Sequence, residues 1–328
     1  MMAGSHGPGP AASYAKKSIN PTMTTSNQST RVILATAGYD FSIRLWDASA
    51  GVSYKTFSHP EKQVNSLCVT ADKANLLAGG NPVLRWYDCN SAGSDSLLMF
   101  EGHTGNVRAV GANRAGRFLF SGSEDGTIKI WDPRAGTSCV CDFDARKAIN
   151  TVVLHPNQGE LISGDNTGAV RVWDLAANKC SSELVPEGDT PISSVAVAAD
   201  ASLIAAGNFN GNCYFWSPGE EYVPVKKLRA HRAYITACRL SPDSRFFATA
   251  SSDRTVKLWN MHDFSLAATL AGHTRWVWDA AFSADSSFIV TASSDQTAKL
   301  WDIDGGCVVR TYQGHVKGLT CVALNDSL

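Results

Sequence analysis

A Trp-Asp dipeptide, or a close variant of it, recurs along this chain at a nearly constant interval, and this repeat restricts the possible fold more than any other feature. The aromatic members of the repeat are Trp46, Tyr87, Trp131, Trp173, Trp216, Trp259 and Trp301. Successive members are 41 to 44 residues apart. A period of about 40–45 residues with this signature is typical of a four-stranded propeller blade. The repeat therefore predicts an all-β fold built from such blades.

The last complete unit shows how four strands fit into one repeat. Residues 277–282, 288–292, 298–301 and 308–312 alternate in polarity as half-buried strands do, and short Gly-, Ser- or Asp-rich turns separate them. Other units follow the same order, and no convincing amphipathic helix interrupts it. Each unit is therefore expected to form one antiparallel blade.

The two ends of the chain each carry part of a unit. After Trp301, the Gly314-His315 pair and an apolar stretch at 319–324 begin another repeat that has no Trp-Asp. The N-terminal part starts in mid-unit, with an apolar stretch that leads into Asp40 and Trp46. We therefore predict that the C-terminal strand completes blade 1 and closes a seven-bladed ring, which leaves no open sheet edge. An open solenoid is the alternative, but it would need capping repeats.

Residues 1–30 and 31–328 differ sharply in composition. The first segment is rich in Gly, Pro, Ser and Thr and has no periodic pattern, so it is expected to be a disordered extension. The second is expected to be the propeller.

Four units carry a His, a Ser or Thr, an Asp and a Trp at matching positions, and we call each set a tetrad. The tetrads are His315, Thr36, Asp40 and Trp46 in blade 1; His103, Ser121, Asp125 and Trp131 in blade 3; His231, Thr249, Asp253 and Trp259 in blade 6; and His273, Thr291, Asp295 and Trp301 in blade 7. The same residue types form hydrolase triads. Four copies in one chain favour instead a buried hydrogen-bond network that fixes each blade.

The remaining blades depart from this pattern. Blade 2 keeps His59 but has Leu77 and Tyr87, whereas blades 4 and 5 lack the His and have Thr167 and Asn210 at the turn. We expect these blades to depend more on apolar packing than on polar networks. Lower local stability is therefore predicted for residues 145–217.

Composition and charge narrow the functional classes. The chain has 328 residues, of which 44% are hydrophobic, and its formal net charge of −1 gives no indication of a nucleic-acid or anionic-membrane binder. No stretch approaches the length of a membrane helix, and the N-terminus lacks a signal-peptide core, so a cytoplasmic location is expected. The nine cysteines are expected to be reduced, and no metal or cofactor is predicted.

Binding is expected on the face made by the loops that enter the innermost strands and by the residue that precedes each turn Asp. Large or polar side chains there have no obvious core role. The predicted partner-binding residues are Trp276, Trp278, Asp279, Tyr234, Tyr39, Phe209, Arg108, Asn106 and Asn65. Trp276 and Trp278 flank an inward-pointing Val277 and are the strongest candidates.

Several stretches resemble one family more narrowly than WD-repeat proteins in general. They are ILATAGYDFSIRLW at 33–46, LISGDNTGAVRVWDL at 161–175, AAGNFNGNCYFW at 205–216, HTRWVWDAAFSADSSFIVTASSD at 273–295 and CVALNDS at 321–327. Together they resemble the G-protein-β-like "lethal with sec thirteen" eight subunits of target of rapamycin (TOR) kinase complexes. The likeness includes blades 4 and 5, which general WD-repeat proteins would not share. The extension before Arg31 departs from the family pattern.

This resemblance implies a non-catalytic scaffold subunit that binds and stabilises a TOR-type kinase domain on its C-terminal lobe and shapes substrate access. It also implies that the chain occurs in complexes with raptor-like or rictor-like subunits and is recruited to endomembranes through them. The resemblance implies no cofactor. Two other classes remain open. One is a ubiquitin-ligase substrate receptor or a G-protein-β-like adaptor, but the sequence has no F-box, acidic adaptor helix or N-terminal coiled-coil heptads. The other is an enzyme, which would need a cluster of titratable residues at the channel.

Overall fold

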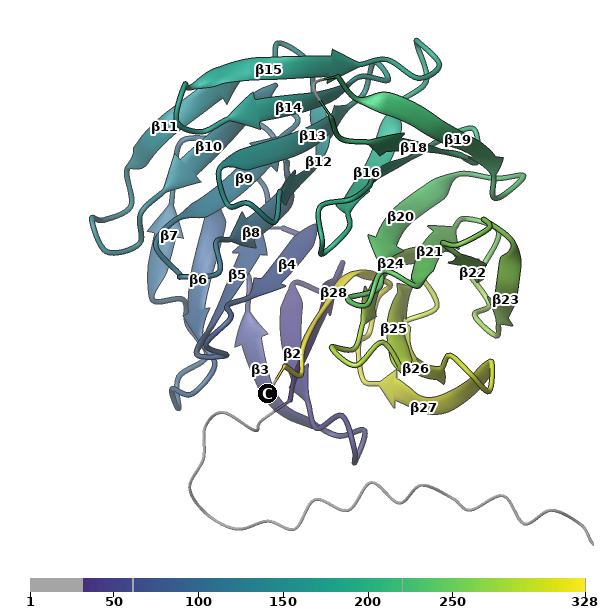
Figure 1. Cartoon of the computed structure of the whole chain (residues 1–328). Helices are drawn as coiled ribbons and strands as arrows, with labels where there is room; N and C mark the ends of the chain where they lie inside the picture. The colour runs from purple at the N-terminus through teal and green to yellow at the C-terminus, as the bar shows by residue number, and fades with distance from the viewer. Residues whose placement is uncertain (1–31, 61, 220, 328) are drawn as a thin grey trace, which may run out of the picture.

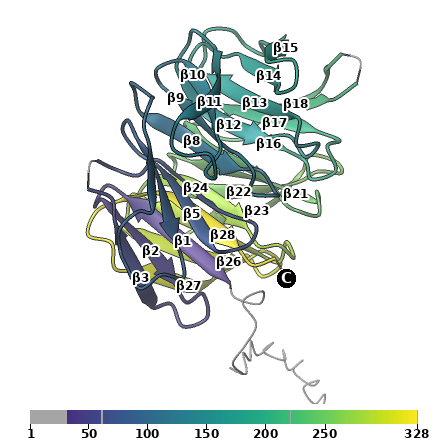
Figure 2. The same cartoon turned by 90° about the vertical axis from the view of Figure 1, so that its left-hand side faces the viewer.

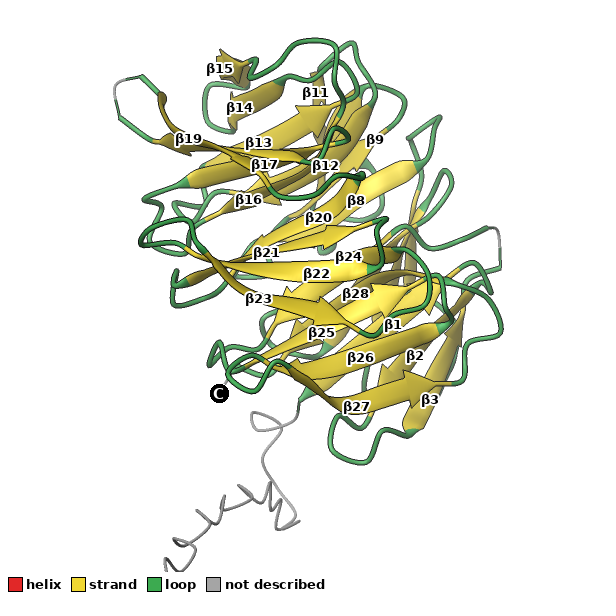
Figure 3. Cartoon of the chain, turned by 90° about the vertical axis from the view of Figure 1, so that its right-hand side faces the viewer, coloured by secondary structure: helices red, strands yellow, loops and turns green. Residues whose placement is uncertain are grey.

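Seven four-stranded antiparallel sheets are arranged around a central axis (Figure 1). The computed structural model describes residues 32–60, 62–219 and 221–327, and every helix or strand assigned within them is a β-strand (Figure 3). The seven-bladed all-β propeller predicted from the repeat is confirmed. The disorder predicted for residues 1–30 falls outside the described residues.

The strands follow one another around the ring. Blade 1 contains β1 (Ile33–Gly38), β2 (Ser42–Trp46), β3 (Ser53–Ser58) and β28 (Leu319–Asn325). Blade 2 contains β4 (Ser66–Val69), β5 (Asn75–Gly79), β6 (Leu84–Asp88) and β7 (Leu98–Phe100). Blade 3 contains β8 (Val107–Ala112), β9 (Leu119–Ser123), β10 (Thr127–Trp131) and β11 (Cys139–Asp144). Blade 4 contains β12 (Ile149–Leu154), β13 (Glu160–Asp165), β14 (Val170–Asp174) and β15 (Lys179–Leu184).

The second half of the ring repeats the pattern. Blade 5 contains β16 (Ile192–Val197), β17 (Ile204–Asn208), β18 (Asn212–Ser217) and β19 (Val223–Arg229). Blade 6 contains β20 (Ile235–Leu240), β21 (Phe246–Ser251), β22 (Thr255–Asn260) and β23 (Leu266–Ala271). Blade 7 contains β24 (Val277–Phe282), β25 (Phe288–Ser293), β26 (Thr297–Asp302) and β27 (Cys307–Gln313). The first strand of blades 2–7, and β28 in blade 1, lies nearest the axis.

The C-terminal strand closes the ring. β28 is the innermost strand of blade 1 and pairs antiparallel with β1, with Leu34 opposite Leu324 and Ala37 opposite Cys321. In Figure 1 the yellow β28 lies beside the purple strands of blade 1, and Figure 2 shows β1 and β28 next to each other from the side. The Asn325 amide also donates to the carbonyl of Thr70 in blade 2 at 2.8 Å. Chain ends far apart in sequence thus complete one sheet, as the two partial units predict.

The core lies between neighbouring blades. Between blades 7 and 1, Val290, Tyr312 and Val322 pack with Leu34 and Trp46. The rings of Trp46 and Tyr312 are 5.6 Å apart. Because each sheet is covered on both faces, its second strand is an almost continuous buried run, as in Ile33–Gly38, rather than an alternating one.

A β-bulge near the start of most innermost strands directs one side chain toward the axis. The register shifts between Val277 and Asp279 in β24, and between Ile235 and Ala237 in β20. Such a bulge leaves one residue unpaired and changes the direction of its side chain. The residues skipped in this way are Arg108, Asn150, Ser193, Thr236, Trp278 and Thr320. All six line the central channel.

Candidate functional site

The tetrad of blade 7 is a closed chain of hydrogen bonds. Asp295 Oδ2 and His273 Nδ1 are 2.8 Å apart, and His273 Nε2 is 2.7 Å from Thr291 Oγ1. Trp301 donates its indole N–H to the same hydroxyl oxygen at 2.9 Å. Thr291 has 0% exposed surface. The hydroxyl is committed to the fold and cannot reach a substrate.

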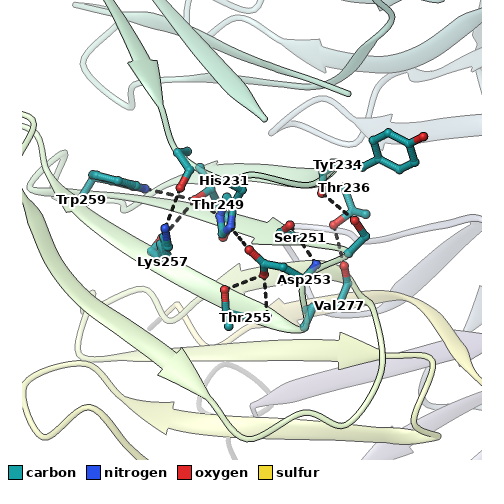
Figure 4. Close-up of polar contacts among 12 residues, drawn as sticks. His231, Tyr234, Thr236, Thr249, Ser251, Asp253, Thr255, Lys257, Trp259 and Val277 are labelled. Carbon is teal, nitrogen blue, oxygen red and sulfur yellow. Dashed lines mark hydrogen bonds and ion pairs between the residues drawn. The ribbon is translucent and has the colours of Figure 1, made fainter. Parts of the chain in front are cut away.

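The other three tetrads have the same geometry. In blade 6, His231 lies 2.7 Å from Asp253 and 2.8 Å from Thr249, as Figure 4 shows. Corresponding distances are 2.8 and 2.8 Å in blade 3, and 2.8 and 2.8 Å in blade 1, where His315 comes from the far end of the chain. Each imidazole thus ties a loop that enters one blade to the turn of that same blade.

Electrostatics favour the ionised form of the tetrad aspartates and, in blade 3, the neutral form of His103. Burial alone would raise the pKa of Asp40, but hydrogen bonds from His315 and Ser42 and the attraction of the imidazole lower it to about 2. Asp125 follows the same logic, and its pKa is lowered to about 2. Burial lowers the pKa of His103, against the opposing effect of Asp125. A neutral imidazole donates from Nδ1 to the carboxylate and accepts the hydroxyl proton at Nε2.

Blade 4 contains a polar network that the sequence reasoning missed, which corrects the expectation that apolar packing replaces the tetrad. Asp165, two positions before Thr167, accepts from the Thr167 amide at 2.8 Å and from the Ala169 amide at 3.0 Å. Its second oxygen forms an ion pair with Arg171 at 2.5 Å, and Arg171 also contacts Glu183 at 3.0 Å. The turn is therefore fixed by an acid and a guanidinium of the same blade.

Blade 5 also has a polar network, but its carboxylate lies in the loop that enters the blade rather than in the turn. Glu187 lies in the loop before β16 and accepts from the amides of Asn208 at 2.9 Å and Asn212 at 3.0 Å. It also accepts the hydroxyl of Tyr214. These bonds, led by the one from Tyr214, lower the pKa of Glu187 to about 2. A carboxylate on the loop and neutral donors in the sheet thus replace the His and Asp of a tetrad.

In blade 2 a tyrosine replaces the tryptophan and shortens the network. The Tyr87 hydroxyl lies 3.1 Å from His59 Nδ1 and donates to the Ser58 carbonyl at 3.0 Å. Both residues have 0% exposed surface. The histidine is therefore held by its own blade without a hydroxyl at position 77.

Apart from Asp279, the partner-binding residues predicted from sequence lie at one end of the propeller, which we call the turn face. It consists of the loops before the innermost strands and the turns between the second and third strands. Backbone hydrogen bonds join the two parts, from Ser294 N to Trp276 O at 2.9 Å and from Ser252 N to Tyr234 O at 3.0 Å. Tyr234 and Trp276 therefore occupy equivalent positions in blades 6 and 7, at which blade 3 has Asn106.

Four aromatic side chains form a continuous row across blades 5, 6 and 7, which we call the aromatic arc: Phe209, Tyr234, Trp276 and Trp278. Successive ring centres are 5.4, 6.3 and 5.5 Å apart. Tyr234 is 52% exposed and Trp276 is 41% exposed. Ring centres at such distances are those of packed aromatic pairs, so the arc is a continuous apolar surface rather than a set of isolated exposed rings.

Trp278 connects the arc to the channel. It is the bulge residue of β24, and its indole N–H donates to the Ser294 hydroxyl at 2.6 Å. Trp278, Phe209 and Tyr39 all line the mouth of an axial cavity of about 530 Å³. Tyr39 is exposed and belongs to blade 1, which is next to blade 7 in the ring.

Asp279 is not part of an exposed binding face, which corrects the sequence-based assignment. It is buried, pairs with Arg239 of blade 6 at 2.5 Å and accepts the amide of Val322 in blade 1 at 3.2 Å. Burial raises its pKa despite these partners. Asp279 therefore joins three consecutive blades at the channel wall.

Asn65 also ties blades together, with an inter-blade bond that recurs around the channel. Its side-chain amide donates to the Val107 carbonyl of blade 3 at 3.1 Å. Asn150 donates in the same way to Ile192 at 2.9 Å, and Thr236 donates to Val277 at 2.6 Å, as Figure 4 shows for the latter pair. Asn65 is therefore a structural residue of the channel wall as well as a half-buried member of the predicted face.

Arg108 and Asn106 form a separate polar group on blade 3. Both contact Glu124: Asn106 through a 2.8 Å hydrogen bond and Arg108 through a 3.7 Å ion pair. They lie away from the four-ring arc, on a blade without an aromatic residue at the Tyr234 position. The structure thus divides the predicted face into an aromatic part and a polar part.

Neither a metal centre nor a membrane helix is found within residues 32–60, 62–219 and 221–327. No three His, Cys, Asp or Glu side chains in these ranges gather closely enough to hold a metal ion. No helix there is long and apolar enough to span a membrane.

Comparison with known proteins gives a consistent result. The WD domain, G-beta repeat model matches residues 94–132, 137–174, 178–217, 222–260 and 264–302. The "Target of rapamycin complex subunit wat1" of Schizosaccharomyces pombe is 49% identical over 239 residues, which are 71% of this chain and 76% of that protein. The "Target of rapamycin complex subunit LST8-1" of Arabidopsis thaliana is 50% identical over 248 residues, 74% of this chain and 81% of the relative. The Saccharomyces cerevisiae LST8 subunit is 47% identical over 248 residues, covering 74% and 82%.

This chain belongs to the LST8 family of WD-repeat proteins. The family resemblance drawn from its sequence is confirmed. Each matched WD repeat is offset from a structural blade by one strand: the last repeat, residues 264–302, begins with β23 of blade 6 and ends with β26 of blade 7. This offset locks adjacent blades of the LST8 propeller together.

Proposed function

We propose that this LST8-family chain is a non-catalytic subunit of TOR kinase complexes and binds the kinase domain through the aromatic arc. The similar proteins of fission yeast, Arabidopsis and budding yeast are all named as TOR complex subunits. The observation that carries the binding mode is the arc itself, in which exposed Tyr234 and Trp276 pack against Phe209 and Trp278. Organised aromatic surface of this kind is characteristic of the centres of protein interfaces.

The tetrads support a scaffold rather than an enzyme. Their hydroxyl groups, on Thr36, Ser121, Thr249 and Thr291, all have 0% exposed surface and accept indole N–H groups. A nucleophile must reach its substrate, and these hydroxyls are sealed inside the sheets. The chain acts by binding: it stabilises the kinase domain and limits how substrates approach its cleft.

The complexes contain raptor-like or rictor-like subunits, and the chain functions in the cytoplasm and reaches endomembranes as part of them. This part of the proposal rests on the family relationship alone. Fluorescence microscopy of the tagged chain, with and without depletion of the kinase, tests it; a location unaffected by kinase loss contradicts it.

Affinity purification of the tagged full chain from its own cells, followed by mass spectrometry, tests the proposed function. We expect a TOR-type kinase together with large helical-repeat subunits. Recovery of cullin adaptors or Gγ-like peptides without the kinase contradicts the proposal and favours a ubiquitin-ligase receptor or a G-protein-β-like adaptor. The double variant Leu266→Ala with Val309→Ala, which changes exposed apolar residues on outer strands, is the control and should retain the kinase.

A further inference from the structure

The turns of blades 6, 7 and 1 differ from those of blades 3, 4 and 5 at one backbone position. The residue after the turn Asp, or its equivalent, has a positive φ in all six blades. It is Gly126, Gly168 and Gly211 in blades 3, 4 and 5, with φ of 87°, 95° and 82°, and Arg254, Gln296 and Phe41 in blades 6, 7 and 1, with φ of 75°, 71° and 61°. Glycine adopts this conformation freely, whereas a residue with a side chain is strained there.

Packing explains glycine in two of these turns but not the side chains in the others. A side chain at Gly211 would meet the His231 carbonyl at 2.3 Å, and one at Gly168 would meet the Thr190 carbonyl at 2.8 Å. In blades 6, 7 and 1 the corresponding side chains are exposed. Strained backbone positions cluster at functional sites, so these three exposed side chains are candidates for a role in binding.

Charge is distributed unevenly over the same face. The loops and turns of blades 6, 7 and 1 at 230–234, 252–254, 272–276, 294–296, 314–318 and 39–41 carry Arg232, Arg254, Arg275 and Lys317. The acids in these segments are Asp40, Asp253 and Asp295, each bonded to a tetrad histidine. The corresponding segments of blades 3, 4 and 5, at 102–106, 124–126, 144–148, 166–168, 187–191 and 209–211, carry two bases, Arg146 and Lys147, and five acids, Glu124, Asp125, Asp144, Glu187 and Asp189. The half of the turn face formed by blades 6, 7 and 1, which holds Tyr234, Trp276 and Trp278 of the arc, is therefore the more basic half.

Two of these arginines lie close to Trp276, at the edge of the arc. Arg254 and Arg275 line one hollow with Trp276, Ser252, Thr274 and Ser294. Other arginines of blade 6 are paired, Arg239 with Asp279 and Arg245 with Asp243, both at 2.5 Å. Within the described part of the chain, neither Arg254 nor Arg275 forms an ion pair. Two unpaired guanidinium groups beside an indole suit a carboxylate next to an apolar side chain.

We infer that the basic half of the turn face, formed by Arg232, Arg254, Arg275 and Lys317 around the aromatic arc, docks an acidic segment of the kinase, and that Arg254 and Arg275 hold its carboxylates. This inference rests on the proposed function and adds the chemistry of the partner. The apolar side chains of the segment lie on Tyr234 and Trp276. The negative charge of this segment also speeds association with the basic half of the turn face, because complementary charge steers partners together.

Binding of the full chain to the full-length TOR-type kinase, measured by surface plasmon resonance at about 50 and 300 mM salt, tests this inference. The double variant Arg254→Glu with Arg275→Glu is expected to weaken binding roughly tenfold or more at low salt, mainly through slower association, and to lose the salt dependence of the original chain. The control Arg114→Glu with Lys179→Glu makes the same charge change on exposed residues of the opposite face and should bind unchanged.

A second variant separates binding from folding. Arg254→Gly removes both the guanidinium and the backbone strain, so its Tm should stay the same or rise by roughly 1–3 °C while binding weakens. If the original chain binds the kinase and both arginine variants bind equally well, this inference is wrong and the proposed function stands. If the original chain does not bind the kinase at all, the proposed function fails and the inference fails with it.

Discussion

Blades 7 and 5 hold the same loop against the same turn with opposite placement of charge. In blade 7 the loop supplies the donor, His273, and the turn supplies the acid, Asp295. In blade 5 the loop supplies the acid, Glu187, and the sheet supplies the donors Asn208 and Asn212. Blade 4 uses a third arrangement, in which Asp165 and Arg171 both belong to the blade. The propeller therefore requires a satisfied polar link at each turn but not one particular set of residues.

The largest expected effect of breaking such a link is in blade 4. Asp165→Ala leaves the guanidinium of Arg171, which is 14% exposed, without its shortest ion pair and removes the acceptor of two turn amides. Loss of one partner of a buried pair costs about 3–5 kcal/mol. Urea unfolding should show this loss, whereas Asp200→Ala at an exposed turn is the control. A loss for Asp165→Ala as small as that of the control would mean that blade 4 does rely on apolar packing.

A smaller loss is expected in a tetrad. Thr291→Val keeps the shape of the side chain but removes the oxygen that accepts from Trp301 and contacts His273. Leaving buried polar groups without partners costs about 1–3 kcal/mol. The free energy of unfolding should fall by that amount, and the aromatic arc should still bind its partner. An unchanged unfolding free energy would show that the tetrad hydrogen bonds are replaceable.

A single neutral donor in blade 5 should matter less. Tyr214→Phe removes one of several hydrogen bonds to Glu187, and the amides of Asn208 and Asn212 remain. The expected loss is about 1 kcal/mol, the typical net worth of one hydrogen bond. Thermal unfolding of the variant provides the measurement, and a loss as large as that for Asp165→Ala would contradict a shared network.

Lowering the pH should reduce the stability of blade 3 more than that of blade 5, by less than the effects above. The pKa of buried His103 is lowered, so the unfolded chain takes up a proton more readily than the folded one as pH falls. The contribution of His103 to stability is present above its unfolded pKa of about 6.5 and is lost as pH falls below it. Glu187, with its pKa lowered to about 2, stays ionised over the same range.

Hydrogen exchange at pH 7.5 and 5.5, corrected for the intrinsic rate, measures this difference. Protection of β9 and β10 in blade 3 should fall relative to that of β17 and β18 in blade 5. The variant His103→Gln should remove the difference. Equal changes in both blades would show that His103 does not govern the response of blade 3.

The sequence predicts the ring and its closure well because both depend on spacing. Trp301, Asp295 and His273 recur at fixed intervals, and the partial units at the two ends add up to one blade. The substitutes for the tetrad do not keep that spacing. Asp165 lies two positions before the expected turn residue, and Glu187 lies one position before the expected histidine. A search for carboxylates within two residues of each missing position would have found both.

The binding face was only partly predictable for a different reason. Tyr234 and Trp276 lie at the same position of successive units, so their neighbourhood follows from the repeat. Asp279 alternates with Trp278 along one strand, and only the β-bulge determines which side chain reaches the face and which is buried. The lower stability predicted for residues 145–217 stays a prediction, but the networks of Asp165 and Glu187 remove the reason given for it.

The central claim is that the tetrads hold the fold while the aromatic arc binds the kinase, and one pair of substitutions tests it directly. Trp276→Ala with Trp278→Ala removes the two indoles of the arc without touching a tetrad. The affinity for the full-length kinase should fall at least tenfold, because central aromatic residues typically dominate binding energy, while circular dichroism shows an intact β fold. An unchanged affinity in a folded double variant would contradict the account.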